Sequence, residues 1–393
     1  MKRFFIKLTF WKAATVIILT AGAYSTFIRF TKGLGTATNL NDKFPWGLWI
    51  GFDVLCGVGL AAGGFTLAAM VYIFSIKRYE PVIRPTILTA FLGYVLVIVA
   101  LMFDLGRPLQ IWHAIIMWNH HSVMFEVAWC VMLYTAVLAL EFAPVVLEKF
   151  KMSKTIRVLK RVSIPIVIAG VLLSTLHQSS LGSLYLIVPE KLHGLWYSSY
   201  LRVFFYVSAI AAGCAMIIFE SFLSARAFNK GLDMNLLNEI SRIGVVMLAV
   251  YLTMKIVDFV NNSALPLLLI PRTETYLFWL EMSVGVITPL ILLSFEKVRK
   301  NQTGLFVGAI MIILGFILNR MNITITGMES WAGVAYFPSW MEISVTFAII
   351  TLGFMVFALA TKYLPVFQHT HHDENKKPTH DYVKDLHLMS QQN

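Results

Sequence analysis

Ionisable side chains recur inside long apolar stretches of this 393-residue chain, in surroundings that normally reject charge. An ionised side chain at the centre of a bilayer costs about 2.5 to 3.5 kcal/mol, so each one needs a partner, a polar cavity or a function. Carboxylates in such places can take up and release protons, which predicts proton transfer inside a membrane. The candidates are Asp53, Asp104, Glu126, Glu141, His177, Glu220, Lys255, Asp258, Glu281 and Glu342, with Arg107 and Arg320 at the rims of their stretches.

Two glutamates of one stretch, Glu126 and Glu141, are candidates for the ends of a proton route. Their separation corresponds to a helical rise of about 22 Å, so one would lie near each face of the membrane. It is also close to four turns, which predicts that both project to similar sides of the helix. Glu220, near the inner end of another stretch, would extend the route. Any one of the three could instead only satisfy a hydroxyl or a backbone group.

His177 lies well inside an apolar stretch and is followed by Gln178, Ser179 and Ser180. A neutral imidazole beside an amide and hydroxyl groups suits a quinone carbonyl. It can donate a hydrogen bond to the oxygen and then pass a proton as that oxygen becomes an anion. The alternative is a packing histidine that is hydrogen-bonded to a neighbouring helix.

The other histidines and the cysteines do not predict a metal or haem site. A haem inside a bilayer normally needs two axial ligands on facing helices, commonly histidines. The three cysteines occur singly in separate stretches, which gives neither a metal-binding pair nor an iron–sulfur cluster. We therefore expect no haem, no cluster and no metal site in this chain. His113, His120, His121 and His193 all lie in predicted loops.

Composition places the chain in the polytopic membrane class. It is 58% hydrophobic and only 13% charged, with a mean hydropathy of +0.72. A hydrocarbon core of roughly 30 Å needs about 20 apolar residues per helical span. The sequence thus predicts an all-α integral membrane protein with ten transmembrane helices. These are expected near 11–31, 46–75, 84–104, 122–147, 162–180, 202–225, 243–262, 275–295, 303–320 and 339–362.

The net charge of +11 follows this topology and does not indicate a nucleic-acid partner. Most lysines and arginines fall in alternate loops that also include both termini, and such loops face the cytoplasm. We therefore expect both termini in the cytoplasm, in the inner membrane of a bacterium or archaeon. Residues 1–365 would form the membrane domain, and the polar segment 366–393 a disordered cytoplasmic tail. The outer loops 107–121 and 181–200 are rich in aromatic residues, which suits either a docking surface or interfacial anchoring.

Two further patterns predict contacts between helices. Lys255 and Asp258 are three residues apart, so they can meet on one helix face as a structural ion pair. Glycines at intervals of four or eight residues in the second stretch predict close helix packing. They are Gly47, Gly51, Gly59 and Gly63.

With these residues in view, the chain resembles the NrfD/PsrC family of membrane subunits, and within it the HybB-type subunits of periplasm-facing nickel–iron hydrogenases. The resemblance covers nearly the whole chain. The strings that carry it are FPWGLWIGFD at 44–53, GG at 63–64, RP at 84–85, SVMFE at 122–126, LEFAP at 140–144, HQSSLGS at 177–183 and YFPSWME at 336–342.

The resemblance implies ten helices built around two four-helix bundles, with a quinone pocket near the periplasmic side. It also implies that the chain has no redox cofactor of its own and exchanges electrons with an extracytoplasmic, ferredoxin-like iron–sulfur subunit. Matched residue by residue, His177 and Asp53 would line the quinone site, Glu126 would handle its protons, and Glu141 and Glu220 would belong to an inner route. We also assign Gln178, Asp104 and Arg107 to the quinone site.

The expected function is therefore that of a quinone-reactive membrane anchor in a respiratory oxidoreductase, using menaquinone or ubiquinone. A nickel–iron hydrogenase is the expected catalytic partner, and a polysulfide, nitrite or related reductase is the alternative. An ion transporter or proton channel is a rival hypothesis, which would require unwound spans in matching halves of the chain. A passive anchor without a quinone site is a further rival.

Overall fold

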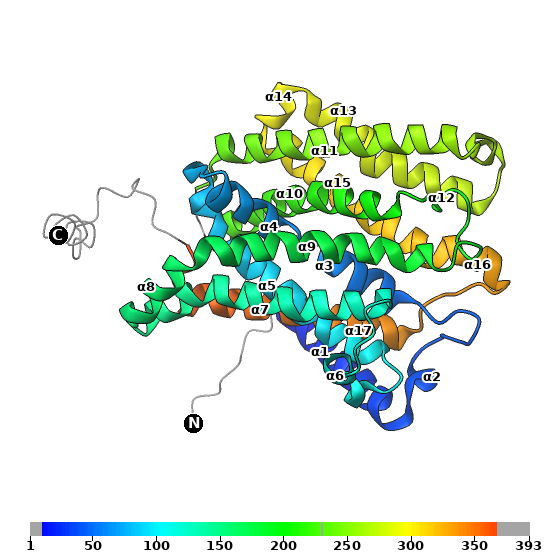
Figure 1. Cartoon of the computed structure of the whole chain (residues 1–393), viewed down its shortest axis with the longest axis horizontal. Helices are drawn as coiled ribbons and strands as arrows, with labels where there is room; N and C mark the ends of the chain where they lie inside the picture. The colour runs from blue at the N-terminus through cyan, green and yellow to red at the C-terminus, as the bar shows by residue number, and fades with distance from the viewer. Residues whose placement is uncertain (1–9, 229–230, 368–393) are drawn as a thin grey trace, which may run out of the picture.

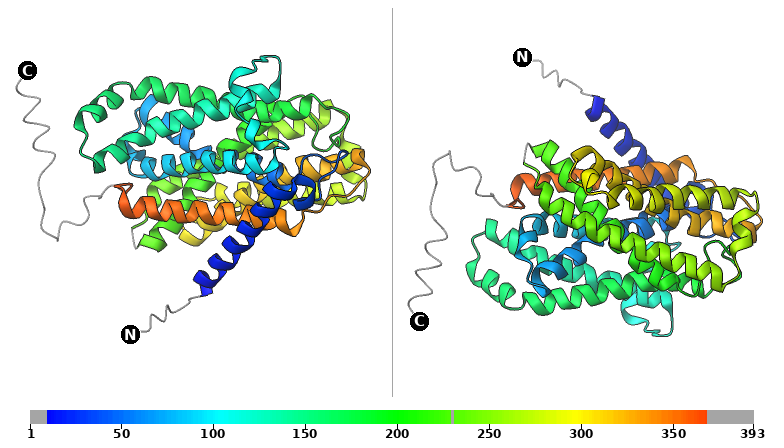
Figure 2. Two further views of the ribbon diagram at one scale, coloured as in Figure 1. Left: turned by 90° about the horizontal axis from the view of Figure 1, so that it is seen from below. Right: turned by 90° about the horizontal axis from the view of Figure 1, so that it is seen from above.

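The structure is a computed structural model that describes residues 10–228 and 231–367, and these residues form helices and no strand. Ten of the helices are long and apolar enough to cross a membrane, which confirms the predicted all-α membrane class. Most of them lie roughly parallel (Figure 1), whereas the first span runs obliquely to the others (Figure 2). We call the end with residues 105–122 and 187–200 the outer end. The predicted tail lies outside the described residues, apart from positions 366 and 367.

Spans two to five form the first bundle. The second span is irregular because two π-helical segments flank two short α-helices, and a turn separates those α-helices. The third, fourth and fifth spans are long α-helices that pack against one another and against the second span. The elements are η1 (Trp49–Cys56), α3 (Gly57–Leu60), α4 (Gly63–Ala68), η2 (Ala69–Ile73), η3 (Lys77–Tyr79), α5 (Glu80–Asp104), α7 (Val123–Lys149) and α9 (Ser163–Leu186).

Spans six to nine form the second bundle, and its last two spans also contain π-helical segments. Such segments are rare and often occur at functional sites. The elements are α10 (Leu201–Phe228), α11 (Met234–Asn261), α12 (Thr273–Met282), η6 (Ser283–Ile287), α13 (Thr288–Ser294), α15 (Gln302–Met321), η7 (Asn322–Thr326) and α16 (Gly327–Ala332).

The first and last spans, α1 (Phe10–Lys32) and α17 (Trp340–Tyr363), pair with each other, and α17 also packs against α5. Figure 2 shows the two crossing one side of the bundles. The arrangement is thus two four-helix bundles and two further helices, as predicted. The remaining short helices are α2 (Leu34–Ala37), η4 (Pro108–Gln110), α6 (His113–Ile116), α8 (Ser153–Arg161), η5 (Leu265–Leu269) and α14 (Glu296–Arg299).

Glycines let the two bundles approach closely, as their spacing predicted. A Cβ atom on Gly63 would lie 2.9 Å from the backbone oxygen of Gly213 on α10, and one on Gly59 would lie 2.1 Å from the ring of Phe316 on α15. Neither position could hold a larger side chain without movement of its neighbour. Within the second bundle, Gly285 and Gly315 make a similar backbone contact between η6 and α15.

Candidate functional site

His177 lies in the interior of the first bundle and is hydrogen-bonded to a tyrosine of the facing helix. Its Nδ1 atom is 2.8 Å from the hydroxyl oxygen of Tyr94 on α5, and both side chains are 0% exposed. The other ring nitrogen, Nε2, is buried without a hydrogen-bond partner among the described residues. The protonated nitrogen of a neutral imidazole is set by the bond that the other nitrogen makes. In the tautomer in which the Tyr94 hydroxyl donates to Nδ1, the imidazole proton is on Nε2.

Three more buried polar atoms that lack a hydrogen bond of ordinary geometry lie on the helices around His177. They are Oη of Tyr134 on α7, Oγ of Ser174 and Oε1 of Gln178, all buried. The rings of Tyr94 and Tyr134 meet edge to face with centroids 4.7 Å apart, and Ser174 lies beside both tyrosines. An unpaired buried polar group costs about 1 to 3 kcal/mol and is rare in folded proteins. This polar cluster is therefore suited to take up water or a polar ligand.

Gln178 links the cluster to the irregular second span. Its amide nitrogen donates to the backbone oxygen of Val58 on α3, at 3.1 Å. Val58 lies two residues after the end of the π-helical segment η1, which carries Asp53. His177 and Gln178, both assigned to the quinone site from the sequence, are buried in the first bundle.

Glu141 lies at the inner end of the same bundle, in the wall of a cavity of about 360 Å³. The guanidinium of Arg84 and the carboxylate of Glu148, which also line this cavity, form two hydrogen bonds of 2.9 Å. We call this cavity the inner vestibule; α5, α7, α8 and the start of α9 surround it. It brings Glu141 within reach of the inner surface.

A glycine connects the inner vestibule to the polar cluster. A Cβ atom on Gly170 of α9 would lie 3.3 Å from Oε1 of Glu141 and 3.6 Å from the ring of Tyr134. Glu141 and Tyr134 therefore both pack on α9 at Gly170, together with Val137, whose methyl group would lie 3.1 Å from that Cβ atom. The resulting order of side chains from the inner end outward is Glu141, Tyr134, Tyr94 and His177.

The other two predicted carboxylates lie apart from this series. Glu220 on α10 lies beside Thr89 of α5, and its Oε1 is buried without a partner in the described part of the chain. Glu126 is exposed in the first turns of α7 and accepts no hydrogen bond from the described residues. Glu126 is thus exposed near the outer end of α7, whereas Glu141 lines the inner vestibule near its inner end.

The remaining residues assigned to the quinone site lie on the side of α1 and α17. Asp53 is buried and accepts a 2.6 Å hydrogen bond from the hydroxyl of Thr346. Asp104 lies near Arg29, whose guanidinium donates to backbone oxygens at the end of α5. Arg107 is exposed beyond that end. The predicted site residues therefore occupy two places, one around His177 and one around Asp53 and Asp104.

Glu342 joins the outer loops to α17 near the place that Asp53 and Asp104 occupy. Its carboxylate accepts hydrogen bonds from the backbone nitrogens of Asn39, at 3.0 Å, and Ser339, at 2.8 Å. It also accepts one from the hydroxyl of Tyr336. Burial and the neighbouring Glu342 raise the pKa of Tyr336, which lies in the loop before α17. Glu342 therefore has a structural role at the outer end.

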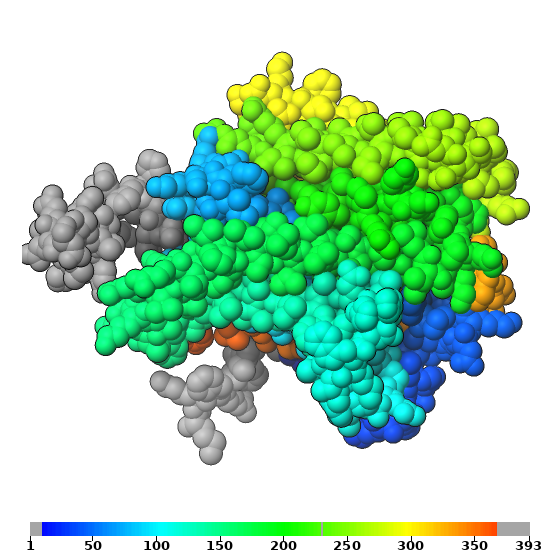
Figure 3. Space-filling view, in the orientation of Figure 1, coloured from blue at the N-terminus to red at the C-terminus, as the bar shows by residue number. Residues whose placement is uncertain are grey.

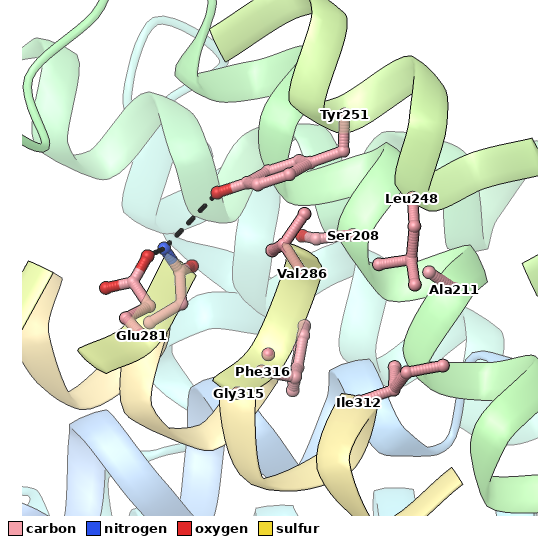
Figure 4. A pocket seen from close by; sticks show the side chains of 11 residues that line it. Ser208, Ala211, Leu248, Tyr251, Glu281, Val286, Ile312, Gly315 and Phe316 are labelled. Carbon is pink, nitrogen blue, oxygen red and sulfur yellow. Dashed lines mark hydrogen bonds between the residues drawn. The ribbon is translucent and has the colours of Figure 1, made fainter. Parts of the chain in front are cut away.

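The second bundle holds a separate network around Glu281, which borders a cavity of about 30 Å³ (Figure 4). The Glu281 carboxylate accepts hydrogen bonds from Trp196 at 2.9 Å, Asn319 at 2.7 Å and Asn322 at 2.8 Å. Asn319 also reaches the hydroxyl of Tyr251 at 3.4 Å. In contrast to the polar cluster around His177, these buried groups have partners, which is typical of a network that fixes packing.

Lys255 and Asp258 do not form the predicted ion pair. The Nζ atom of Lys255 lies 4.9 Å from the ring centroid of Phe204 and 5.5 Å from that of Phe259. Asp258 instead accepts hydrogen bonds from Ser198 at 2.6 Å and from Asn262. The physical reason is that aromatic faces attract the ammonium group, while hydroxyl and amide donors satisfy the carboxylate.

Sequence reasoning missed Tyr94, Tyr134 and Ser174, although each faces His177 or the route towards it. The available signal was the presence of polar side chains near the middle of spans three, four and five. Hydroxyl groups carry no charge, so they do not stand out in an apolar stretch as carboxylates do. Their role becomes visible only when the three helices are packed together.

Comparison with known proteins gives a consistent set of relatives. Residues 36–332 match the model of the family described as polysulphide reductase, NrfD. A protein of Nitratidesulfovibrio vulgaris is 40% identical over 366 residues, which cover 90% of this chain and 93% of that protein. The probable Ni/Fe-hydrogenase 2 b-type cytochrome subunit of Escherichia coli is 32% identical over 88% of this chain and 91% of its own length. The menaquinone reductase integral membrane subunit of N. vulgaris is 27% identical, over 92% of each.

The name of the E. coli relative implies a b-type haem, so we tested whether the described histidines could hold one. Within the described spans, His177 is the one histidine, and Tyr94 already occupies its Nδ1 atom. The other described histidines lie between α5 and α7 or before α10. These residues do not provide a facing pair of axial ligands, and we derive no step through haem.

Proposed function

The chain belongs to the NrfD polysulphide reductase family, and we propose that it is the quinone-reactive membrane subunit of a respiratory oxidoreductase. In this role it exchanges electrons between an extracytoplasmic iron–sulfur subunit and menaquinone or ubiquinone. The observation that carries the proposal is the polar cluster around His177, with four unpaired buried atoms in the first bundle. Such a cluster suits a reaction that moves protons to or from a polar ligand.

His177 and Gln178 supply complementary groups for a quinone headgroup. The Nε2–H group of His177 can donate to a quinone carbonyl, and Oε1 of Gln178 can accept from the hydroxyl of the quinol. Both side chains are at most 1% exposed, so entry of the headgroup requires local opening of the packing. The π-helical segment η1 lies next to Val58, the residue that Gln178 contacts. Asp53 belongs to η1 and would therefore lie beside the quinone site.

Each quinone that is reduced takes two electrons and two protons. In our proposal the protons come from the inner vestibule through Glu141, Tyr134, Tyr94 and His177, because each of these side chains lies next to the following one. Ser174 and water taken up by the polar cluster would complete the hydrogen-bond path. Glu220 would be a second inner carboxylate that supplies protons to the first bundle. Glu126, being exposed, would exchange protons at the outer side.

Proton uptake from the inner side would make the reaction sensitive to the membrane potential. Moving one charge across 100 mV corresponds to about 2.3 kcal/mol. Electrons that arrive from the outer side and protons that arrive from the inner side together move charge across the whole membrane. The potential would therefore oppose quinone reduction and favour quinol oxidation.

For the catalytic partner we propose a nickel–iron hydrogenase, because a relative with 32% identity over nearly its full length carries that name. A reductase complex is the alternative, supported by the menaquinone reductase relative and by the family description. Both options assign electron exchange with quinone to the membrane subunit. We further propose that the chain resides in the cytoplasmic membrane with both termini inside, as its charge distribution indicates.

The proposal can be tested by measuring quinone bound to the complex purified from its native membrane. The double variant His177→Leu, Gln178→Leu removes the donor and the acceptor, whereas Tyr251→Phe alters a hydroxyl of the second bundle and serves as the control. We expect bound quinone and quinone turnover in the wild type and the control, and loss of both in the double variant. Retained quinone and turnover in the double variant would show that the site lies elsewhere or that the chain is a passive anchor.

A further inference from the structure

The segment between α5 and α7, residues 106–122, forms a lateral arm on the first bundle. It contains η4 and α6, and Figure 3 shows it projecting sideways from the bundle. The other views agree, since the segment stands out from the flank of the bundle in each of them (Figure 2). The indole nitrogen of Trp129 on α7 donates to the backbone oxygen of Ala114 at 2.9 Å and so holds the arm in place.

The surface of the lateral arm is apolar and uncharged. Residues 108–118 include no aspartate, glutamate, lysine or arginine. Leu109 is 84% exposed, and Trp118 is 68% exposed although its ring packs on that of Trp129, with centroids 4.7 Å apart. Large apolar patches that are left exposed in this way mark contact with a membrane or another protein. The other exposed apolar side chains of the arm are Trp112, Ile115, Ile116 and Met117.

The backbone of the arm is satisfied largely by local hydrogen bonds. Successive turns are closed by bonds from Gln110 to Arg107, from Ile115 to Trp112 and from Met117 to His113. Hydrocarbon offers no hydrogen-bond partner, so backbone in contact with lipid must be satisfied within the protein. The arm meets this requirement through short helical turns.

Charged groups are absent from the middle of the arm, where Gln110 and His113 are the only polar side chains. Arg107 precedes the apolar part and is exposed, and Asn119, His120 and His121 follow it. Tryptophan is enriched where membrane proteins cross from hydrocarbon to headgroups, and the arm carries Trp112 and Trp118. This order suits a segment that enters a leaflet and returns to the headgroup layer.

We propose that the lateral arm inserts into the outer leaflet of the bilayer and that lipid acyl chains cover its apolar face. A protein partner bound to the outer loops would meet the ends of the spans, whereas the arm lies along their flank. The face also lacks the charges with which a partner subunit could be recognised. The inference does not depend on the quinone reaction.

Collision measurements on a nitroxide label test the proposal in the intact complex, reconstituted in nanodiscs of phosphatidylethanolamine and phosphatidylglycerol. The label is attached at Ile116→Cys, and the three native cysteines are buried. Lys43→Cys on an exposed outer turn is the aqueous reference, and Leu172→Cys on the exposed side of α9 is the acyl-chain reference. Molecular oxygen concentrates in lipid, whereas a charged nickel chelate stays in water.

We expect the label at position 116 to behave like the label at position 172. Its collision rate with the nickel chelate should be about ten-fold or more below that at position 43, because polar solutes are excluded from hydrocarbon. A nickel collision rate like that at position 43 would place the arm in water and overturn the proposal. Low rates for both oxygen and nickel would show that a protein subunit covers the arm, which would overturn it as well.

Discussion

The hydroxyl of Tyr94 on α5 and the Nδ1 atom of His177 on α9 are 2.8 Å apart inside the first bundle, and both residues are fully buried. This bond has a chemical consequence, because it occupies Nδ1 and leaves Nε2 of His177 as the ring nitrogen without a partner among the described residues. Tyr94 also touches Tyr134, which faces Glu141 across Gly170. One tyrosine thus joins the proposed quinone donor to the proposed proton route.

Removing the Tyr94 hydroxyl should therefore slow quinone turnover. Tyr94→Phe keeps the ring that packs on Tyr134 but leaves Nδ1 of His177 unpaired, so the imidazole loses its fixed tautomer and its proton supply. We expect turnover to fall about 10²-fold, which is at the low end of the range of rate effects that a positioned general acid or base contributes. The assay is steady-state reduction of a soluble menaquinone analogue by the reduced complex. Tyr251→Phe is the matched control, and an equal loss in that variant would contradict a specific role for Tyr94.

A side chain at position 170 should interrupt the proton route without removing any ionisable group. In Gly170→Ala the new methyl group would lie 3.1 Å from Val137 and 3.3 Å from the Glu141 carboxylate. We expect slower proton uptake and slower quinone turnover, with unchanged electron transfer into the iron–sulfur partner. Gly244→Ala is the control, because the added methyl group there meets only an ordinary contact of 3.5 Å. Stopped-flow measurement with a pH dye gives the uptake rate, and equal rates in both variants would argue against this route.

The two glutamates of α7 should give different phenotypes because only Glu141 borders the inner vestibule. Glu141→Gln should abolish proton uptake from the inner side. Glu126→Gln should slow turnover but leave the number of inner-side protons per quinone unchanged, with the complex still assembled. The measurement is the ratio of protons to quinone in sealed vesicles. Unchanged turnover in Glu126→Gln would remove that residue from the mechanism.

The second bundle should respond to substitution mainly through stability. Glu281→Leu leaves the donors on Trp196, Asn319 and Asn322 without their acceptor. Unpaired buried donors cost about 1 to 3 kcal/mol each, so we expect a loss of at least about 3 kcal/mol. A lower unfolding temperature of the purified complex would show this. Normal thermal stability with complete loss of quinone turnover would instead point to a direct role of Glu281 in the reaction.

Much of the fold could be predicted because hydropathy alone determines where membrane helices lie. The glycines of the second span also gave the correct close contacts, as at Gly59 and Gly63. The side chains that surround His177 could not be predicted, since Tyr94 and Tyr134 come from helices distant in sequence. Their meeting depends on the rotation of each helix in the bundle.

Spacing along one helix did not predict what surrounds each side chain. Fifteen residues at 3.6 per turn leave a rotation of only roughly 60° beyond four turns, so the different surroundings of Glu126 and Glu141 come from the opposite ends of α7 at which they lie. Lys255 and Asp258 had the right spacing for a pair, but aromatic rings and hydroxyl donors from other helices offered better partners. Spacing along one helix therefore predicts possible contacts, and tertiary packing selects among them.

The central claim is that protons for quinone reach His177 from the inner side of the membrane. The most direct measurement is proton uptake during quinone reduction in vesicles with the complex in one orientation, using pH dyes on each side. We predict that both protons per quinone are taken up on the side of the inner vestibule and that Glu141→Gln abolishes this uptake. Uptake of both protons on the outer side, unchanged in Glu141→Gln, would contradict the proposed route.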